Sequence, residues 1–409
     1  MSILFKNALV VDATELGARD GAVYVENGQI RDTEFSGRVP ENCQVFDLKG
    51  NSLMPGLIDC HVHVVASMMN LAQNAALPDS LAVLRTVPIM RGMLERGFTT
   101  VRDVGGAPVA LADAQVQGLI AGPKLIVCGK ALSKTGGHTD FRQKYDVREP
   151  HRNDHRFGSL GRIADGPEEV RHACREELRQ GARFIKVMAN GGVGSPTDPI
   201  DWFGYSEDEL RAAVSEARDA RTYVSAHLYT AAGIKRAVEC GVHSLEHCNL
   251  IDDETAALAA AAGAVAVPTL TIFEAQAREG ERLGLPKENR PKLDMVRSAG
   301  FKSIEILRNA GVKMAYGTDL LGETHEYQNE EFRYRSEVLS PVEVLASATT
   351  TAADLIGAGE RLGAIREGVI ADLLVVEGNP LRNIDLLAAP LHNVRMVIQN
   401  GIVVIDRGF

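Results

Sequence analysis

The chain has 409 residues, of which 45% are hydrophobic, so it can bury a large core and is long enough for two domains or for one barrel with additions. Its 54 acidic residues outnumber its 44 basic ones, and the resulting formal charge of -10 argues against a surface for nucleic acid or anionic membranes. These properties favour an ordinary soluble protein whose partner is a small molecule.

Cysteine usage and the start of the chain indicate the cellular setting. The six cysteines show no C-x-x-C spacing, and several stand inside apolar runs, where a free thiol behaves as a small hydrophobic residue. The chain begins with MSILFKNALVVDA, which lacks a basic leader before a long apolar stretch, and no later segment approaches membrane-spanning length. We therefore expect a cytoplasmic protein with no membrane partner.

Both ends of the chain alternate short β-rich runs with turn residues. ILFKNALVVDA, GAVYVENGQI and CQVFDLKGNSLMP read as strands near the start, and an Asn-Gly pair at residues 27–28 signals a hairpin turn. The end of the chain repeats this texture, with an Asn-Gly pair at residues 400–401. The sequence therefore predicts a small β-sandwich domain formed by residues 1–54 and 361–409, and a different fold in residues 55–360.

The middle of the chain alternates short apolar runs with longer helical stretches, the pattern of β/α units around a parallel sheet. Eight strand candidates can be counted, and eight such units close on themselves as a (β/α)8 or TIM barrel, an α/β fold. The strand candidates are residues 57–64, 98–104, 124–129, 183–189, 222–228, 242–248, 264–270 and 312–319. Amphipathic helices are predicted at residues 167–181, 207–220 and 290–311.

Polar side chains stand at the ends of several of these strands. His61 and His63 are two residues apart, and because strand side chains alternate, both imidazoles point to the same side. A solvent-facing pair is the alternative, but the strand is too apolar for an exposed edge. His227, His247 and Asp319 each close a different strand, where TIM barrels build their active sites, although an Asp after Gly-Thr is often a helix cap. Together these side chains predict a metal site.

Lys186, in RFIKVMANGG, decides between one metal ion and two. A lysine inside an apolar barrel strand is costly to bury as an isolated cation, so it needs an anionic partner or a chemical modification. Addition of CO2 to its amine gives a carbamate, an anion whose two oxygens can bridge two cations. The alternative is a buried lysine paired with Asp319.

Several segments together resemble the amidohydrolase superfamily. GLIDCHVHV, FIKVMANGG, VSAHLY, SLEHC and YGTDLL carry the likeness, and GGHTD resembles its imidazolonepropionase-like dipeptidase branch, which includes prolidases and dipeptidases acting on C-terminal Arg or Lys. The resemblance spans the whole chain, because that superfamily also pairs its barrel with a small sheet domain from both termini. It implies a hydrolase that cleaves the amide bond of dipeptides or N-acyl amino acids, with Xaa-Pro substrates as first choice.

The resemblance also implies the cofactors, which are two divalent metal ions. Their ligands would be His61, His63, Lys186, His227, His247 and Asp319. The first two histidines and the aspartate hold the more buried ion, the other two histidines hold the second, and the lysine, carboxylated to N6-carboxylysine, bridges both. Imidazole and hard oxygen ligands suit zinc, while Mn, Fe or Co fit the same set.

The expected chemistry is attack by a hydroxide held between the two cations, whose charge lowers the pKa of a shared water. Asp319 takes the proton of that water and returns it to the departing nitrogen, as general base and then general acid. The resemblance suggests that His138 and Tyr229 bind the substrate carbonyl or carboxylate, because both donate hydrogen bonds. Simple packing is the alternative role for Tyr229.

Two further loops stand near the predicted site. NGGVGSP is a weak match to a phosphate-binding glycine loop, because no Lys-Ser/Thr or helix opening follows it, so we expect a flexible loop that shapes the pocket beside Lys186. After the eighth strand, Glu323, His325 and Tyr327 could reach the substrate, but the sequence does not orient them.

Two other functions stay open at this point. A cyclic-amide hydrolase or a deaminase of the same superfamily is the first; Lys186 weighs against most deaminases and does not exclude cyclic-amide hydrolases. A non-catalytic scaffold is the second, and it is disfavoured because all six ligand candidates are present. The superfamily often assembles into rings, which predicts a homo-oligomer.

Overall fold

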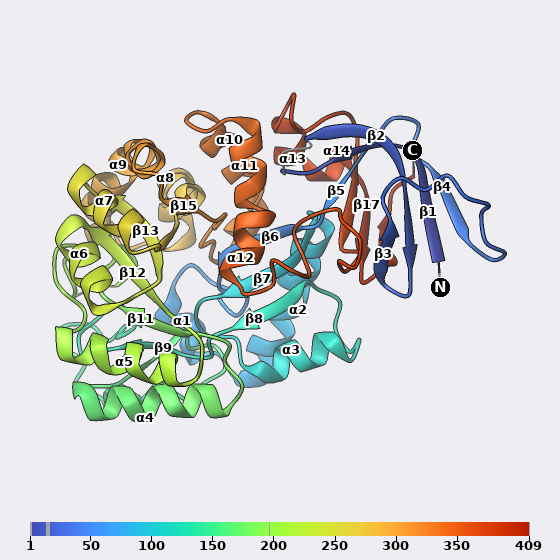
Figure 1. Ribbon diagram of the computed structural model, residues 1–409. Coiled ribbons are helices and arrows are strands. Elements are labelled where there is room, and N and C mark those ends of the chain that lie inside the picture. Colours follow the sequence, from blue (N-terminus) through green and yellow to red (C-terminus); the bar gives the residue numbers. More distant parts are fainter. Residues whose placement is uncertain (1, 14–16, 196, 409) are drawn as a thin grey trace.

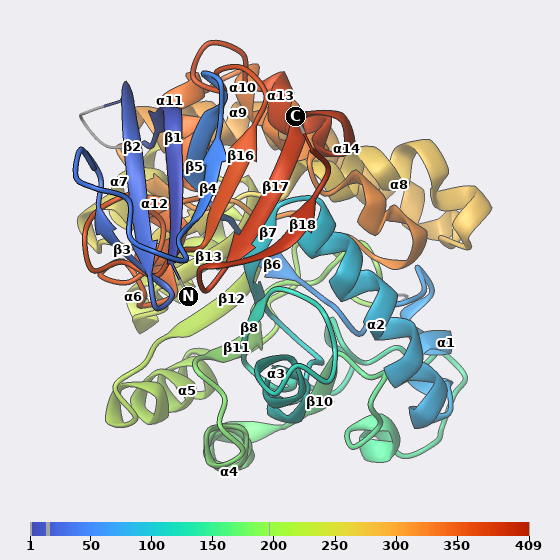
Figure 2. The same cartoon turned by 90° about the vertical axis from the view of Figure 1, so that its right-hand side faces the viewer.

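The computed structural model describes residues 2–13, 17–195 and 197–408, and Figures 1 and 2 show it from two sides. A barrel of parallel strands wrapped by helices forms the larger part. A sheet built from both ends of the chain lies beside it, with its blue and red strands at the right of Figure 1. This is the predicted TIM barrel with a small β domain. The boundaries predicted between the two parts stay a proposal.

The terminal sheet joins the two ends of the chain. Its strands run in the order β18-β17-β16-β5-β1-β2-β3, and β4 pairs with β1. The ends meet where β5 and β16 pair antiparallel, with Leu373 opposite Pro55 and Val376 opposite Ser52. The strands are β1 (Ser2–Val11), β2 (Ala18–Glu26), β3 (Gln29–Asp32), β4 (Gln44–Asp47), β5 (Ser52–Pro55), β16 (Leu373–Val376), β17 (Val394–Gln399) and β18 (Ile402–Asp406).

The two predicted Asn-Gly turns form, and they pack against each other. All four turn residues have positive φ, between 52° and 79°, as the tight turn of a two-residue hairpin requires. A Cβ atom on Gly28 would lie 2.9 Å from the carbonyl oxygen of Asn400, so only glycine permits this approach. The two hairpins are thereby fixed side by side at one end of the sheet.

All eight predicted barrel strands are present and parallel. They are β6 (Leu57–Val62), β7 (Phe98–Asp103), β8 (Lys124–Val127), β11 (Ile185–Met188), β12 (Val224–Thr230), β13 (Ser244–Leu250), β14 (Val265–Val267) and β15 (Lys313–Met314). Backbone hydrogen bonds complete the ring between β8 and β11 and between β15 and β6, where the amide of Cys60 donates to the carbonyl of Tyr316 at 2.7 Å. Two short strands, β9 (Ala131–Ser133) and β10 (Gly161–Ile163), were not predicted; they extend the sheet beside β11.

Helices cover the outside of the barrel. The predicted helices correspond to α4 (Gly166–Arg179), α5 (Glu207–Asp219) and α9 (Arg290–Asn309). At the start of α5, Ser206 and Glu209 form a reciprocal capping box. The other barrel helices are α1 (Leu71–Ala76), α2 (Asp79–Glu95), α3 (Val109–Val116), α6 (Ala231–Cys240), α7 (Asp253–Ala261), α8 (Leu270–Leu283), α10 (Glu330–Ser336), α11 (Pro341–Ser347) and α12 (Thr350–Leu355).

Short helical turns complete the secondary structure. They are η1 (Pro150–Asn153), η2 (Lys287–Asn289), η3 (Gly322–Tyr327), α13 (Asp385–Ala388) and α14 (Pro390–Asn393). In the part of the chain that the structure describes, no helix combines the length and the apolar character needed to cross a lipid bilayer. The six cysteines are free thiols, and five of them are buried.

Candidate metal centre

A cavity at the carboxyl ends of the barrel strands brings together every side chain that the sequence predicts for the site. The six predicted metal ligands and the two predicted substrate contacts all line it: His61, His63, His138, Lys186, His227, Tyr229, His247 and Asp319.

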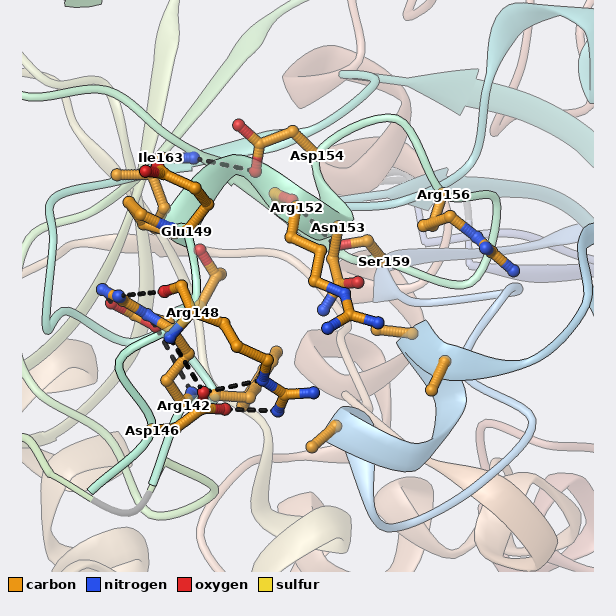
Figure 3. Close-up of a pocket in the computed structure, with 18 residues that line it drawn as sticks. Arg142, Asp146, Arg148, Glu149, Arg152, Asn153, Asp154, Arg156, Ser159 and Ile163 are labelled. Carbon is orange, nitrogen blue, oxygen red and sulfur yellow. Dashed lines mark hydrogen bonds and ion pairs between the residues drawn. The ribbon is translucent and has the colours of Figure 1, made fainter. Parts of the chain in front are cut away.

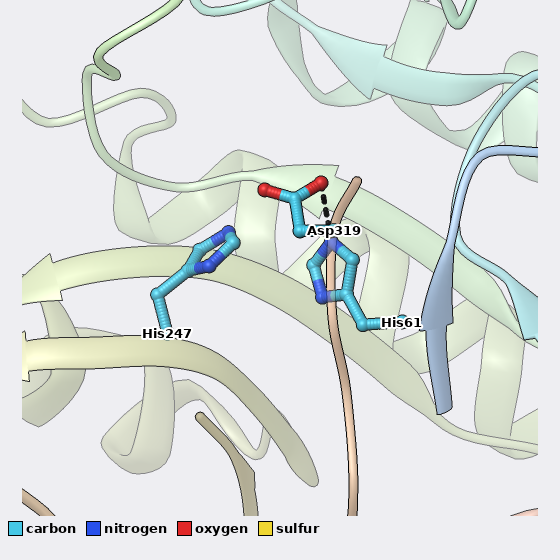
Figure 4. A group of neighbouring side chains, drawn as sticks. All are labelled: His61, His247 and Asp319. Atoms are coloured by element: carbon cyan, nitrogen blue, oxygen red, sulfur yellow. Dashed lines mark ion pairs between the residues drawn. The ribbon is translucent and has the colours of Figure 1, made fainter. Parts of the chain in front are cut away.

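His61 and His63 both face the carboxylate of Asp319. The Nε2 atoms of the two rings lie 3.3 Å and 3.2 Å from the same oxygen, Oδ1. His247 approaches from β13, so that one ligand atom each from His61, His247 and Asp319 lies within 4.8 Å of the others. Figure 4 shows these three side chains pointing toward one another from separate elements.

Hydrogen bonds at Nδ1 orient the rings of His61 and His63 so that Nε2 of each faces Asp319. The Nδ1 of His61 lies 2.8 Å from a carboxylate oxygen of Glu246, and the Nδ1 of His63 lies 2.9 Å from the carbonyl oxygen of Gly105. Both partners accept hydrogen bonds, so each Nδ1 carries a proton and each Nε2 is the nitrogen that faces Asp319. Two imidazole nitrogens and a carboxylate oxygen this close together are ligands that a divalent cation takes, so the donor set fits a metal ion.

His227 and His247 are held in the neutral form that ligates metals. Burial and then neighbouring positive groups keep the pKa of each ring well below its usual value. The Nε2 of His227 lies 3.2 Å from the carbonyl oxygen of Gly191, and the Nδ1 of His247 lies 2.7 Å from the hydroxyl of Thr269. The opposite nitrogen of each ring is left to face the cavity, and the ring centres are 4.7 Å apart.

Lys186 lies in β11 with 1% of its surface exposed. Among the described residues its ammonium has no hydrogen bond and no ion pair, so the pairing with Asp319 considered from the sequence is not formed. Burial lowers the pKa of the amine. A lowered pKa increases the fraction of neutral amine, which is the form that can react with CO2.

The backbone is strained where two of the side chains project. His247, Cys248 and Asp319 all have positive φ, between 57° and 71°, a conformation that costs of order 1–3 kcal/mol for residues other than glycine. The amide of Asp319 donates to the carbonyl of His61 at 2.8 Å, which ties this strained residue to β6. Strain of this kind clusters at functional sites, where surrounding structure holds it.

The two predicted substrate contacts border the histidines. The ring of His138 stacks on His227 with centres 4.2 Å apart, and its Nδ1 lies 2.7 Å from the hydroxyl of Ser195. Tyr229 stacks on His247 at 5.2 Å, and burial holds the pKa of its phenol well above the usual value. No described residue accepts a hydrogen bond from that phenol, which therefore remains a protonated donor at the cavity wall.

Three hydrogen bonds from one lysine hold the loop after β11, which we expected to be flexible. The ammonium of Lys292, on α9, donates to the carbonyl oxygens of Gly192, Ser195 and Asp198 at 3.1, 3.1 and 2.7 Å. A Cβ atom on Gly192 would lie 1.8 Å from the ring of His138, so the predicted glycine run allows a close approach. Pro196, the last residue of the predicted NGGVGSP loop, lies outside the described residues.

The three candidates after the eighth strand point elsewhere. Glu323 pairs with Arg282 at 2.9 Å, and the hydroxyl of Tyr327 donates to Glu279. His325 is buried with its Nε2 3.1 Å from the carbonyl of Ala66, and burial lowers its pKa to about 3. None of the three is among the residues that line the cavity.

The sequence reasoning missed a buried ion pair beneath the site. Glu246 accepts a hydrogen bond from Arg102 at 2.8 Å, and neither side chain is exposed. Its other carboxylate oxygen lies 2.8 Å from the Nδ1 of His61. Burial alone would raise the pKa of Glu246, but the positive charge of Arg102 outweighs burial, so that pKa lies well below its usual value. A signal was present, because a charged residue inside each of the apolar runs FTTVRDV and VHSLEHC requires a partner.

A second cavity adjoins the first and shares Thr139 and Phe141 with it. Figure 3 shows its charged lining. Arg142 forms an ion pair with Asp140, and Arg148 forms one with Asp146. These pairs neutralise much of its charge. We therefore look for the chemistry in the first cavity, where the predicted metal ligands lie close together.

Comparison with known proteins identifies the family of the chain. The model of the amidohydrolase family matches residues 52–404. The crystal structure of an amidohydrolase is 51% identical, with a TM-score of 0.97 and 99% of each chain covered. The crystal structure of a prolidase complexed with N-methylphosphonate-L-proline is 47% identical, with a TM-score of 0.97, and the match covers 99% of this chain and all of that one.

The likeness extends to a curated relative that is less similar in sequence. The ochratoxinase of Aspergillus niger is 33% identical over 405 residues, which span 94% of this chain and 80% of the ochratoxinase. The regions matched by the family model and by the ochratoxinase include strands of the terminal sheet and the whole barrel. The likeness therefore includes every segment that contributes to the cavity.

Proposed function

This chain belongs to the amidohydrolase family and is a hydrolase acting on C–N bonds, and we propose that it cleaves the amide bond of dipeptides or N-acyl amino acids, with Xaa-Pro dipeptides as preferred substrates. One observation carries the proposal: imidazole nitrogens and a carboxylate oxygen converge on one point in the cavity at the carboxyl ends of the barrel strands. The similar prolidase supports the choice of dipeptides.

The family generally uses divalent metals, and we propose two ions here, both zinc. His61, His63 and Asp319 would hold one ion, His227 and His247 would hold the other, and Lys186 as N6-carboxylysine would bridge them. When bound, two such ions lower the pKa of a water and polarise the scissile carbonyl.

Asp319 serves as the proton carrier in this proposal. Burial raises the pKa of its carboxyl, but the surrounding imidazoles outweigh burial, so the pKa lies well below its usual value and the group is ionised at neutral pH. An ionised carboxylate can accept the proton of the attacking water. Its other task is to return that proton to the leaving nitrogen, without which the amine departs slowly.

His138 and Tyr229 position the substrate. The Tyr229 phenol is protonated and has no acceptor among the described residues, so a substrate oxygen can accept its hydrogen bond. His138 stands beside it through His227, on which both rings pack. Together they can hold the carboxylate of the C-terminal residue or the developing oxyanion.

Most of the remaining lining is apolar and fits the hydrophobic parts of such a substrate. Its apolar residues are Leu71, Phe141, Leu160, Met188, Val193, Ile272, Phe273 and Leu321. An uncharged side chain or the ring of a proline can pack against them, whereas a charged side chain gains nothing there. This supports apolar dipeptides over those ending in Arg or Lys.

The test is a panel of dipeptides and N-acyl amino acids that varies the C-terminal residue, assayed with zinc-loaded protein. We expect turnover of several members, with Xaa-Pro dipeptides among the best. Hydrolysis of cyclic amides alone would contradict the proposal and favour a cyclic-amide hydrolase. Fewer than two metal ions per chain would contradict the two-ion site. The cytoplasmic location and the homo-oligomeric state stay predictions.

A further inference from the structure

Gln276 is a buried amide on the wall of the metal-centre cavity with unsatisfied hydrogen-bonding capacity. It lies in α8, and only 6% of its surface is exposed. Its Nε2 has one weak partner, the sulfur of Met69 at 3.8 Å. Its carbonyl oxygen, Oε1, has no hydrogen-bond partner among the described residues. A buried amide oxygen is costly to leave without a donor.

The position of Gln276 on α8 directs it to the substrate side of the site. Phe273 stands three residues earlier on the same helical face, with its ring 6.1 Å from both His247 and Tyr229. Gln276 is therefore the next side chain along the face that borders the metal ligands. The neighbouring wall residues Ile272 and Phe273 are apolar and cannot supply a donor.

The cavity offers few other acceptors for a positively charged group. Asp319 is the one carboxylate among the described residues that line it, and we have proposed that group as a metal ligand. A dipeptide with a free amino terminus brings an ammonium into this space. The uncommitted oxygen of Gln276 is thus the acceptor best suited to receive it.

Topology places Gln276 across the mouth from the groups that would hold the substrate carboxylate. Gln276 follows β14 and contacts Met69 from the loop after β6, and these two strands flank β15 in the ring. His138 follows β9, which pairs with β11 on the other arc. A dipeptide whose carboxylate contacts His138 would extend its amino end toward α8.

We propose that Gln276 accepts a hydrogen bond from the amino-terminal ammonium of the substrate and makes free dipeptides better substrates than N-acyl amino acids. This inference rests on the proposed dipeptidase function and narrows its substrate class. Gln276 is a specificity residue here, and it takes no part in bond cleavage.

The experiment compares two substrates that differ only at the amino group, alanyl-proline and propionyl-proline, using the zinc-loaded full chain. We expect the wild type to favour alanyl-proline by about tenfold or more in kcat/KM, as for a hydrogen bond to a charged group. Gln276→Met keeps the volume and removes the acceptor, so this preference should fall about tenfold, through loss on alanyl-proline. Gln276→Glu keeps an acceptor oxygen and should retain the preference. Gln180→Met, at an exposed glutamine that ends α4, is the control and should change neither substrate.

The outcomes separate this inference from the proposed function. An unchanged ratio in Gln276→Met, an equal loss on both substrates, or loss of the preference in Gln276→Glu would overturn the role of Gln276 while the dipeptidase function stands. Failure of the wild type to cleave either substrate, or any other member of the panel, would overturn the proposed function and this inference with it.

Discussion

Glu246 lies beneath the candidate metal centre and accepts hydrogen bonds from two other side chains of the site, His61 and Arg102. One carboxylate oxygen lies 2.8 Å from the Nδ1 of His61, and the other lies 2.8 Å from the guanidinium of Arg102. The hydroxyls of Ser225 and Ser244 also donate to it, at 2.7 and 2.6 Å. Glu246→Gln keeps the shape and removes the charge, so it tests both roles together.

Two magnitudes follow from this geometry. At 2.8 Å and an effective dielectric constant of about 20, the attraction between Glu246 and Arg102 is about 6 kcal/mol. Removing one charge of a buried pair leaves the other uncompensated, and we expect the metal-free variant to lose about 3–5 kcal/mol of unfolding free energy. Because the amide also orients His61 less firmly, zinc affinity should fall about 10- to 100-fold.

Stability is measured by urea unfolding of the metal-free protein, and zinc affinity by competition with a chromophoric chelator. Glu331→Gln is the matched control, because Glu331 and Arg335 form a second fully buried pair at 2.9 Å that contacts no histidine. We expect this control to lower stability by a similar amount and to leave zinc affinity within about twofold. Equal zinc affinity in Glu246→Gln and wild type would refute the orienting role, and equal stability would refute the charge-pair reasoning.

Three further variants test the site. Lys186→Ala should lose at least one metal ion, measured by elemental analysis, and most of its turnover. Short carboxylic acids that replace the carbamate should partly restore the turnover. Unchanged metal content and rate would exclude the bridging role. Asp319→Asn should keep the far-UV circular dichroism spectrum and lower kcat at least about 100-fold, and near-normal turnover would remove Asp319 as proton carrier. Lys292→Met removes three hydrogen bonds to the loop after β11, so it should lower kcat/KM about tenfold and speed proteolysis within residues 190–198. Lys302→Met, at an exposed lysine of the same helix, is the control and should do neither.

The barrel could be predicted because its signals are periodic and local. Each predicted strand is an apolar run of a length that strands favour, and the amphipathic helices between them follow the helical period. The short strands β9 and β10 were missed, since three residues in a long irregular loop carry no recognisable pattern. Their pairing depends on contacts with β11 that lie far away in the sequence.

The sequence predicts the residues that meet in the cavity, but it does not predict the hydrogen bonds that hold them. Spacing along one strand places His61 beside His63, and strand ends bring in the remaining ligands. The partner that fixes His61, however, is Glu246, 185 residues later, and no local pattern links them. Gln276 left no signal, because a glutamine within a helix is ordinarily an exposed helix former.

The pairing of β5 with β16 bears on how the protein is made. During synthesis β5 emerges early with β1 on one side, and its other edge stays open until residues 373–376 leave the ribosome. Gly56 alone separates β5 from β6, the strand that carries His61, and its amide bonds to Asp372 of the same late segment. An open strand edge invites wrong pairing, so we expect the nascent chain to need protection by chaperones until residues 373–376 pair with β5.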